Sequence, residues 1–311
     1  MEVRINKFLS EAGVCSRREA DRQIAAGNVT IDGRTAQMGE SVLPGQVVCY
    51  KGQPVKKEEE MILIAFHKPK GIVCTAEKRE KNNVIDYIHY PKRIYPVGRL
   101  DKDSEGLLLL TNHGDIVNKM MRAGNRHEKE YIVTVNRPVT DGFLRGLAGG
   151  VPLVELNTTT RKCKVWQTGK KEFHIILTQG LNRQIRRMCE YFGYRVQRLV
   201  RVRIMNIELG ELQPGTYRDV TPEEYGKLTK LLENSSNAPA DMRSGKRMDA
   251  AGTVKVKNAG RTPAGTGTGK RMYAAGTATV KKTTGSGKRI YTAGTAKMKK
   301  ISGNTPENMG K

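Results

Sequence analysis

Apolar positions at helical spacing, followed by short apolar runs typical of strands, mark the first 50 residues. A helix is predicted near the N-terminus, with Ile5, Phe8 and Leu9 on one face. The stretch VTIDG, from Val29 to Gly33, predicts a strand that enters a tight Asp-Gly turn. These elements are expected to form a small α/β domain over residues 1–50.

A second helix is predicted to begin beside Ser16, because Ser16 and Glu19 have the spacing of a capping box. Gly27 is placed to end this helix. Ala20 and Ile24 would face inward, while the arginines of this helix remain outside: Arg17, Arg18 and Arg22. With Arg4 and Lys7 these arginines could form one phosphate-binding face, or they could only keep the domain soluble.

Residues 51–60, KGQPVKKEEE, have the charge and the Gly and Pro content of an interdomain linker. Residues 61–234 then mix helix-like stretches such as NRQIRRMCEYFG with apolar runs of strand length: MILIAFH, LLLLT, EYIVTVN, KCKVWQT and EFHIILT. Short polar breaks between these runs favour a mixed, mainly antiparallel sheet. The predicted fold class is therefore α+β, with a small N-terminal domain and a larger second domain.

The last region, residues 235–311, differs in kind. Three near-copies recur in it, GKRMDAAGT from Gly245, GKRMYAAGT from Gly269 and GKRIYTAGT from Gly287. Between positions 241 and 311 there are 16 Lys and Arg against 3 Asp and Glu, a net charge of 16 − 3 = +13. So few large apolar groups cannot offset the entropy of ordering, which predicts a disordered basic tail. This tail could add non-specific RNA affinity or could be a dispensable extension.

The charge of the whole chain indicates a polyanionic partner. With 55 Lys and Arg against 31 Asp and Glu, the net charge is +24, and nucleic acid is the leading candidate because binding releases counterions from phosphates. No run approaches the roughly twenty apolar residues that span a bilayer, so no membrane partner is expected. Five scattered cysteines without a CxxC spacing indicate reduced thiols in a cytoplasmic protein and no zinc site.

The stretch GRLDKDSEGLLLLT, from Gly98 to Thr111, places three carboxylates before a run of leucines. Its start has the alternating acids and glycine of a calcium loop, but Asn112 occupies the twelfth position, where a bidentate Glu is needed. The alternative is a polar turn that leads into a buried strand. No metal site is expected, and the lack of G-x-G-x-x-G, P-loop and HExxH motifs leaves a nucleotide cofactor without support.

Four segments carry resemblances to two known families. SRREADRQIAAGNVTIDG, from Ser16 to Gly33, resembles the RNA-binding module first named in ribosomal protein S-four. GRLDKDSEGLLLLTNHGD resembles the signature of the RsuA branch of pseudouridine synthases, and EKEYIVTV (128–135) and ILTQGLNRQIRRMC (176–189) resemble its tyrosine and arginine motifs. Together the resemblances cover residue 1 to about 234, which makes residues 61–234 the expected catalytic domain.

The resemblance implies that the protein isomerises a uridine within RNA, without a cofactor or metal. The bond from ribose carbon 1 to the base nitrogen breaks, the base turns, and it rejoins through carbon 5. By resemblance, Asp101 is the essential carboxylate, as a nucleophile at ribose carbon 1 or a base at carbon 2. Asp103 and Glu105 are expected to shape the turn and to face water.

Four further positions take roles from the same resemblance. Arg186, in RQIR, is the expected cationic partner of Asp101, since a guanidinium can hold a carboxylate at two points. Tyr131 would stack on the target base and help to move the proton from carbon 5, and Leu177 would close the other face. Arg99 would fill the gap that a flipped nucleotide leaves. The plainer alternatives are core packing for Tyr131 and Leu177 and a structural hydrogen bond for Arg99.

The basic helix around Arg186 adds expected RNA contacts. Arg183 and Arg187 would meet phosphates there, and Arg186 could be one more such arginine. LNRQIRRMCEYFGY and RVRIMN (201–206) resemble the F type of the branch, which acts on large-subunit ribosomal RNA. Sister types that act on a neighbouring uridine, on small-subunit RNA or on transfer RNA stay open, as does a catalytically silent assembly factor. The expected partner is ribosomal RNA, and nothing in the sequence requires more than a monomer.

Overall fold

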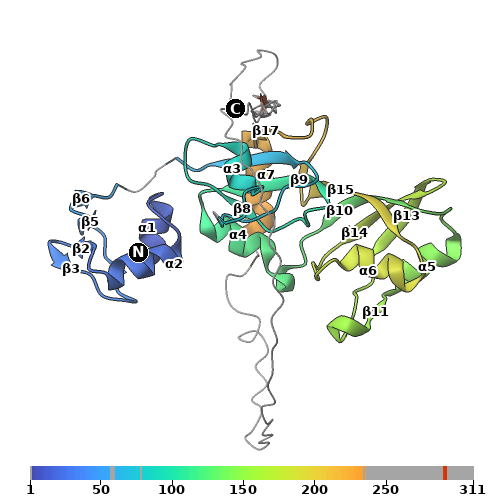
Figure 1. Ribbon diagram of the computed structural model, residues 1–311, viewed down its shortest axis with the longest axis horizontal. Coiled ribbons are helices and arrows are strands. Elements are labelled where there is room, and N and C mark those ends of the chain that lie inside the picture. The colour runs from blue at the N-terminus through green and yellow to red at the C-terminus, as the bar shows by residue number, and fades with distance from the viewer. Residues whose placement is uncertain (1, 57–59, 78, 234, 236–289, 293–311) are drawn as a thin grey trace, which may run out of the picture.

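The computed structural model describes residues 2–56, 60–77, 79–233, 235 and 290–292 (Figure 1). Its N-terminal domain packs two helices, α1 and α2, against short strands. The elements are β1 Val3–Arg4, α1 Ile5–Glu11, α2 Arg17–Ala25, β2 Val29–Ile31, β3 Arg34–Thr35, β4 Ser41–Val42, β5 Val48–Tyr50 and β6 Gln53–Pro54. Strands β3, β2, β5 and β6 form a four-stranded sheet in that order, and β1 pairs with β4.

Local sequence signals determine this domain as predicted. Ser16 caps α2 by accepting a hydrogen bond from the Glu19 amide at 3.2 Å, although the Glu19 carboxylate binds Arg22 and Gln23 instead of completing a capping box. Asp32 and Gly33 both have positive φ, as the predicted turn between β2 and β3 requires. The predicted inward residues are buried in one apolar cluster: Ile5, Leu9, Ala20 and Ile24, with Phe8 packed against it.

A larger sheet carries the rest of the molecule, in the strand order β13-β14-β10-β15-β9-β7-β17-β18, with β8 on β9 and β16 on β15. Its strands are β7 Leu63–Lys68, β8 Tyr95–Val97, β9 Glu105–Thr111, β10 Lys129–Val135, β13 Lys164–Gly169, β14 Glu172–Leu177, β15 Val196–Ile204, β16 Ile207–Glu208, β17 Thr216–Asp219 and β18 Ile290–Thr292. The pairs are antiparallel except β15 with β9, which confirms the predicted mainly antiparallel α+β fold.

Helices and short elements cover this sheet. They are α3 Val84–Ile88, α4 Gly114–Met121, α5 Asp141–Gly149, α6 Gln184–Tyr191 and α7 Pro222–Glu233, with the 3-10 turns η1 Ala123–Asn125 and η2 Val154–Leu156 and the hairpin β11 Pro152–Leu153 and β12 Thr158–Thr159. In Figure 1 the N-terminal domain lies at one end, and the part with β13, β14, α5 and α6 extends to the other. The sheet therefore has two halves that meet between β9 and β15.

The four leucines of β9 are buried on both faces of the first half. Leu107 and Leu109 pack in the cluster that α4 and α7 cover, whereas Leu108 and Leu110 pack in the cluster that includes α3. Because successive side chains of a strand point to opposite faces, only a strand covered on both faces needs such a continuous apolar run. The four leucines therefore belong to a central strand. A calcium loop is excluded, because these residues would have to wrap around the ion and are instead buried in a sheet.

The two halves join through a short parallel contact, in which Val200 pairs with Glu105 and Arg201 with Gly106. Gly106 has φ +109°, and a Cβ atom there would lie 2.3 Å from the Arg201 carbonyl oxygen and 2.5 Å from its nitrogen. Only glycine allows two backbones to approach so closely. Gly106 thus determines how closely the two halves can join.

The sequence from 235 onward lies largely outside the described residues, and the predicted disorder there falls outside them too. Ile290–Thr292, in the third near-copy, is the exception: it is a strand, β18, paired antiparallel with β17. The edge of β17 provides the backbone hydrogen-bond partners of these three residues. Within the described ranges, no helix is long and apolar enough to cross a membrane.

Replacing Gly106 by alanine should lower the free energy of unfolding by roughly 2–4 kcal/mol, because the new Cβ would collide with the backbone of Arg201. Chemical denaturation followed by circular dichroism measures this loss. Gly142→Ala is the matched control, since Gly142 lies in α5 with nothing within 4 Å of its Cβ position, and it should be neutral or stabilising. Equal stability of the Gly106→Ala variant and the wild type would contradict the close approach of the Gly106 and Arg201 backbones.

Candidate active site

A cavity of about 450 Å³ opens where the two halves of the sheet meet. Its walls come from the turn 98–104 before β9, from β10 and β15, and from the segment 177–186 that leads from β14 into α6. Asp101, Tyr131, Leu177 and Arg186 all line it, as do Arg99 and Arg183. The fold therefore brings together six predicted residues that lie in three separate motifs.

The turn that carries Asp101 is held from several directions. The Ser104 amide donates to the Asp101 carbonyl at 3.1 Å, and the Gly71 amide donates to the Lys102 carbonyl at 2.7 Å. Lys68, fully buried on β7, donates its ammonium to the Ser104 carbonyl at 2.8 Å. A carboxylate on this turn is thus fixed relative to the central strands, as catalysis by a single group requires.

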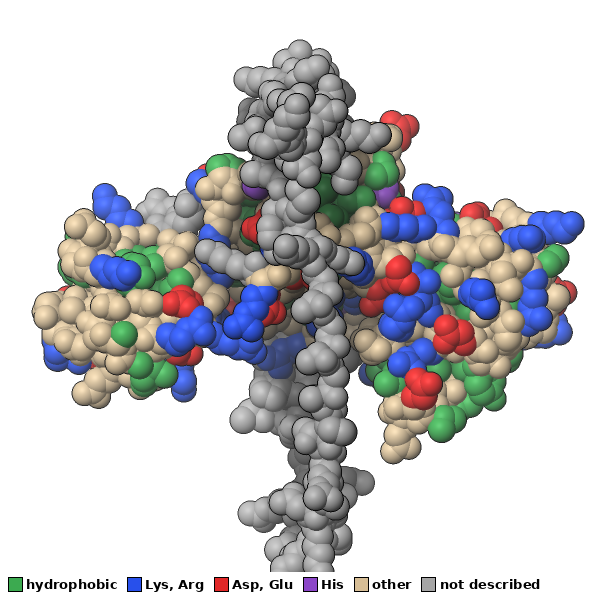
Figure 2. Space-filling model, viewed as in Figure 1, with side chains coloured by type: hydrophobic (Ala, Val, Ile, Leu, Met, Phe, Trp, Pro, Cys, Tyr) green, Lys and Arg blue, Asp and Glu red, His purple; other side chains and the backbone are tan. Residues whose placement is uncertain are grey.

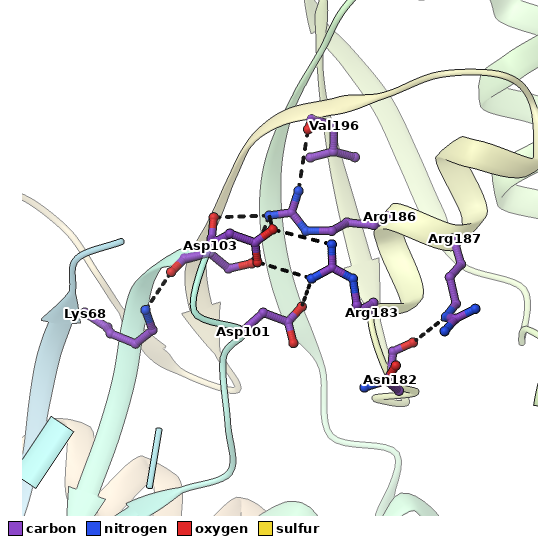
Figure 3. A network of polar contacts seen from close by, with 9 residues as sticks. Lys68, Asp101, Asp103, Asn182, Arg183, Arg186, Arg187 and Val196 are labelled. Atoms are coloured by element: carbon purple, nitrogen blue, oxygen red, sulfur yellow. Dashed lines mark hydrogen bonds and ion pairs between the residues drawn. The ribbon is translucent and has the colours of Figure 1, made fainter. Parts of the chain in front are cut away.

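The cationic partners of the acidic turn differ from the expected pairing (Figure 3). Arg183 places Nη1 at 4.0 Å from the Asp101 carboxylate, while Arg186 contacts the carboxylate of Asp103 at 3.2 Å. Arg186 also donates to the Asp103 carbonyl at 3.1 Å and to the Ser104 hydroxyl at 3.3 Å. Arg186 therefore braces the turn behind Asp101, and Arg183 reaches the Asp101 carboxylate itself.

Arg183 adopts an unusual backbone conformation in order to do this. It precedes α6 with φ +50° and ψ +33°, in the left-handed region that non-glycine residues rarely occupy. Its guanidinium lies between two carboxylates, at 4.0 Å from Asp101 and 3.4 Å from Asp103. Strain of this kind persists where the surrounding structure holds it, and it is common at functional sites.

Two neighbours of Asp101 were expected to face water: Asp103 is half exposed but also pairs with two arginines, whereas Glu105 is largely buried. Burial alone would raise the pKa of Asp103, but Arg186 and Arg183 outweigh this effect and hold its pKa below the ordinary value. These ion pairs are therefore complete at neutral pH and are lost only as the pH falls through the lowered pKa. The Glu105 side chain is 12% exposed and bonds to Arg198 at 2.6 Å, since it lies on β9 next to β15.

Other predicted RNA contacts are distributed differently. Arg187 lies outside the cavity lining, where it donates to the Asn182 carbonyl at 3.2 Å and pairs with Glu155. Lys7 turns toward the second domain and bonds to Asp115 at 3.0 Å. In the N-terminal domain Arg4, Arg17, Arg18 and Arg22 are exposed, as is Arg34, which pairs with Glu40. Figure 2 shows Lys and Arg side chains gathered where this domain faces the central body.

Two cavity residues escaped the sequence interpretation, Lys129 on β10 and Arg201 on β15. Both are charged and more than nine-tenths buried. The sequence could have indicated Lys129, because side chains alternate between the two faces of a strand and Lys129, two residues before Tyr131, lies on the same face as Tyr131. For Arg201 no such signal exists, since its position depends on the pairing of β15 with β10 and β9.

The cavity combines one carboxylate with many cations. Asp101 is the single acidic residue among the residues that line it, against five arginines and one lysine: Arg99, Arg122, Arg183, Arg186, Arg201 and Lys129. In the described part of the chain, no three His, Cys, Asp or Glu side chains gather in a way that could hold a metal ion. The arrangement suits an anionic substrate and a reaction at one carboxylate.

Known families match both domains. Residues 62–191 match the RNA pseudouridylate synthase family, and residues 3–48 match the S4 domain. The chain belongs to the RNA pseudouridylate synthase family and is an RNA pseudouridine synthase with an S4 domain.

Individual relatives and one solved structure agree with this assignment. The chain is 55% identical over 237 residues to the dual-specificity RNA pseudouridine synthase RluF of Escherichia coli O6:H1, covering 76% of this chain and 81% of the relative. It is 34% identical to the ribosomal large subunit pseudouridine synthase B of Bacillus subtilis, with 76% and 99% covered. A crystal structure of a pseudouridylate synthase is 27% identical, with a TM-score of 0.54 and coverages of 73% and 99%.

Asp103→Asn should lower the rate of pseudouridine formation by roughly 10- to 100-fold, because Arg183 and Arg186 would lose the carboxylate that positions them. Single-turnover kinetics with saturating enzyme measure the effect. Asp141→Asn, at the start of α5 and outside the cavity lining, should keep the wild-type rate. A wild-type rate for Asp103→Asn would show that these ion pairs do not position the site.

Proposed function

We propose that this protein converts a specific uridine of 23S ribosomal RNA to pseudouridine and that Asp101 is its essential carboxylate. The observation that carries the proposal is the convergence of Asp101, Tyr131, Leu177 and Arg186 on one basic cavity. The similarity to the ribosomal large subunit pseudouridine synthase B of Bacillus subtilis supports a target in the large subunit. The RluF relatives are named dual-specificity enzymes, and we extend this property to the present chain, which would then modify more than one RNA.

Asp101 would act at the ribose. Its carboxylate attacks carbon 1, or takes a proton from carbon 2, while the bond from carbon 1 to nitrogen breaks. The Arg183 guanidinium lies 4.0 Å from the Asp101 carboxylate, and Arg186 holds the turn by a hydrogen bond to the Asp103 carbonyl. The ionised carboxylate and its rigid turn are the two requirements of this step.

Tyr131 and Leu177 would hold the base. Tyr131 would stack on the uracil ring and help to remove the proton from carbon 5 after the base rejoins, and Leu177 would close the opposite face. A base within paired RNA must first leave its helix, at a cost of a few kcal/mol. Arg99, two residues before Asp101 on the cavity wall, would occupy the space that the base vacates.

The two domains would have separate roles, RNA binding and catalysis. We propose that residues 1–50 bind structured RNA through Arg4, Arg17, Arg18 and Arg22, that 51–60 are a linker, and that 61–234 form the catalytic domain, working as a monomer. Arg183 at the mouth of the cavity would meet an RNA phosphate as well as Asp101. A catalytically silent assembly factor is the competing function, and the following experiment separates the two.

Release of tritium from carbon 5 of uridine in unmodified large-subunit RNA tests the proposal. The wild type should release the label, whereas Asp101→Asn should release none while it still binds RNA, because the substitution keeps the shape of the side chain and removes its charge. Circular dichroism confirms that the variant is folded. Absence of release by the wild type from large-subunit, small-subunit and transfer RNA would favour the assembly factor.

Removal of residues 235–311 distinguishes chemistry from electrostatic binding. Because positions 241–311 carry a net charge of +13, the truncated protein should bind RNA more weakly and with a smaller dependence on salt. Its single-turnover rate at saturating enzyme should stay within about twofold of the wild type, since the cavity lies between residues 98 and 201. Filter binding between low and moderate salt gives the slope, and loss of turnover at saturation would contradict the proposal.

A further inference from the structure

Two buried cations lie side by side in the wall of the cavity, Lys129 on β10 and Arg201 on β15. They are 8% and 2% exposed. Arg201 pairs across the strands with Tyr131, and Lys129 is two residues before Tyr131 on the same strand. Both cations therefore flank the tyrosine on the face that lines the cavity.

Neither cation has the partner that burial would ordinarily demand. In the described part of the chain no carboxylate forms an ion pair with either one, and the Lys129 ammonium makes one long hydrogen bond, 3.4 Å to the His127 carbonyl. Arg201 donates Nε to the Leu107 carbonyl at 2.7 Å and Nη1 to the Arg99 carbonyl at 3.4 Å, but its Nη2 is buried without a partner. Donors of two cations thus remain available to a ligand.

This arrangement costs stability. Burial, with a further contribution from Arg201, lowers the pKa of Lys129 to about 8, yet at neutral pH the ammonium is still mostly protonated. A buried charge without a counterion is unfavourable, and an apolar side chain of the same length would avoid the cost. Such a pair is expected where function requires positive charge.

We propose that Lys129, together with Arg201, stabilises the negative charge that develops on the uracil base when its bond to ribose breaks. The inference rests on the proposed function, because it takes Tyr131 as the platform of the base. When the bond from carbon 1 to nitrogen breaks, both electrons stay with the base, whose charge spreads over the ring nitrogen and the two carbonyl oxygens. Cations beside the base lower the energy of this state in a site that excludes water.

The remaining steps balance without any added reagent. The ribose is held by the Asp101 carboxylate, or has lost its carbon 2 proton to it, while the anion turns. Carbon 5 then bonds to carbon 1 while the carboxylate leaves carbon 1 or, in the second route, returns its proton to carbon 2. The proton leaves carbon 5, and the ring nitrogen takes up a proton. The charge that Lys129 and Arg201 stabilise exists only after the bond from carbon 1 to nitrogen breaks and before the bond from carbon 1 to carbon 5 forms. Their effect is therefore on the reaction rate and not on RNA affinity.

Lys129→Met tests the proposal, with single-turnover rates on RNA that contains uridine or 5-fluorouridine at the target position. Fluorine withdraws electrons, so the detached fluorinated base needs less stabilisation from the protein. The variant should react roughly 100-fold slower on uridine, and about 10-fold slower or less on 5-fluorouridine. Chromatography of the digested RNA follows loss of the original nucleoside in both cases.

Controls separate this role from a structural one. Lys129→Met should keep the RNA affinity of the wild type and should unfold at the same temperature or higher, because the buried charge is gone. Lys129→Arg, which keeps the charge, should retain more activity than Lys129→Met. Lys164→Met, an exposed site on β13, should match the wild type throughout.

Three outcomes would overturn the inference: an unchanged rate, an equal loss on both nucleosides, or a loss of RNA affinity alone. An affinity loss alone would mean that Lys129 contacts a phosphate. Failure of the proposed function is distinct, since the wild type itself would then release no tritium from uridine.

Discussion

The close approach of Gly106 to Arg201 is the constraint on which the rest of the structure depends. Through it a parallel contact of two residue pairs joins halves that are otherwise antiparallel. The contact places the start of β9 against the middle of β15, so the turn that carries Asp101 lies over the strand that carries Arg201. The cavity is a direct result, because the halves meet at β9 and β15 while loops from each cover the junction.

Electrostatics follow from this geometry. Arg183 and Arg186 reach the acidic turn from the start of α6 and hold the pKa of Asp103 below its ordinary value. Arg183 accepts a left-handed backbone to do so, and Arg186 is almost fully buried. The site thus combines backbone strain and a buried charge with a firmly held turn, a common compromise between stability and activity.

The exposed and the buried cations of the cavity suit different negative charges, one on the bound RNA and one that forms during the reaction. Cations at its mouth, such as Arg99 and Arg183, suit RNA phosphates, which are negative before and after the reaction. Lys129 and Arg201 lie deeper, at 8% and 2% exposure, where a permanent phosphate would have to shed its water. A charge that exists only during the reaction fits that depth better.

The sequence by itself determined the local structure and the family. Capping at Ser16 and the turn at Asp32 depend on neighbours a few residues away, and the run of four leucines marks a buried strand, so these patterns can be read along the chain. Family motifs also identified six residues that line the cavity. Only the tertiary structure decided that Arg183 and not Arg186 reaches Asp101, that Arg187 points elsewhere, and that Arg201 lies beside Tyr131. These depend on strand pairing and helix placement between segments up to about a hundred residues apart, which no local pattern encodes.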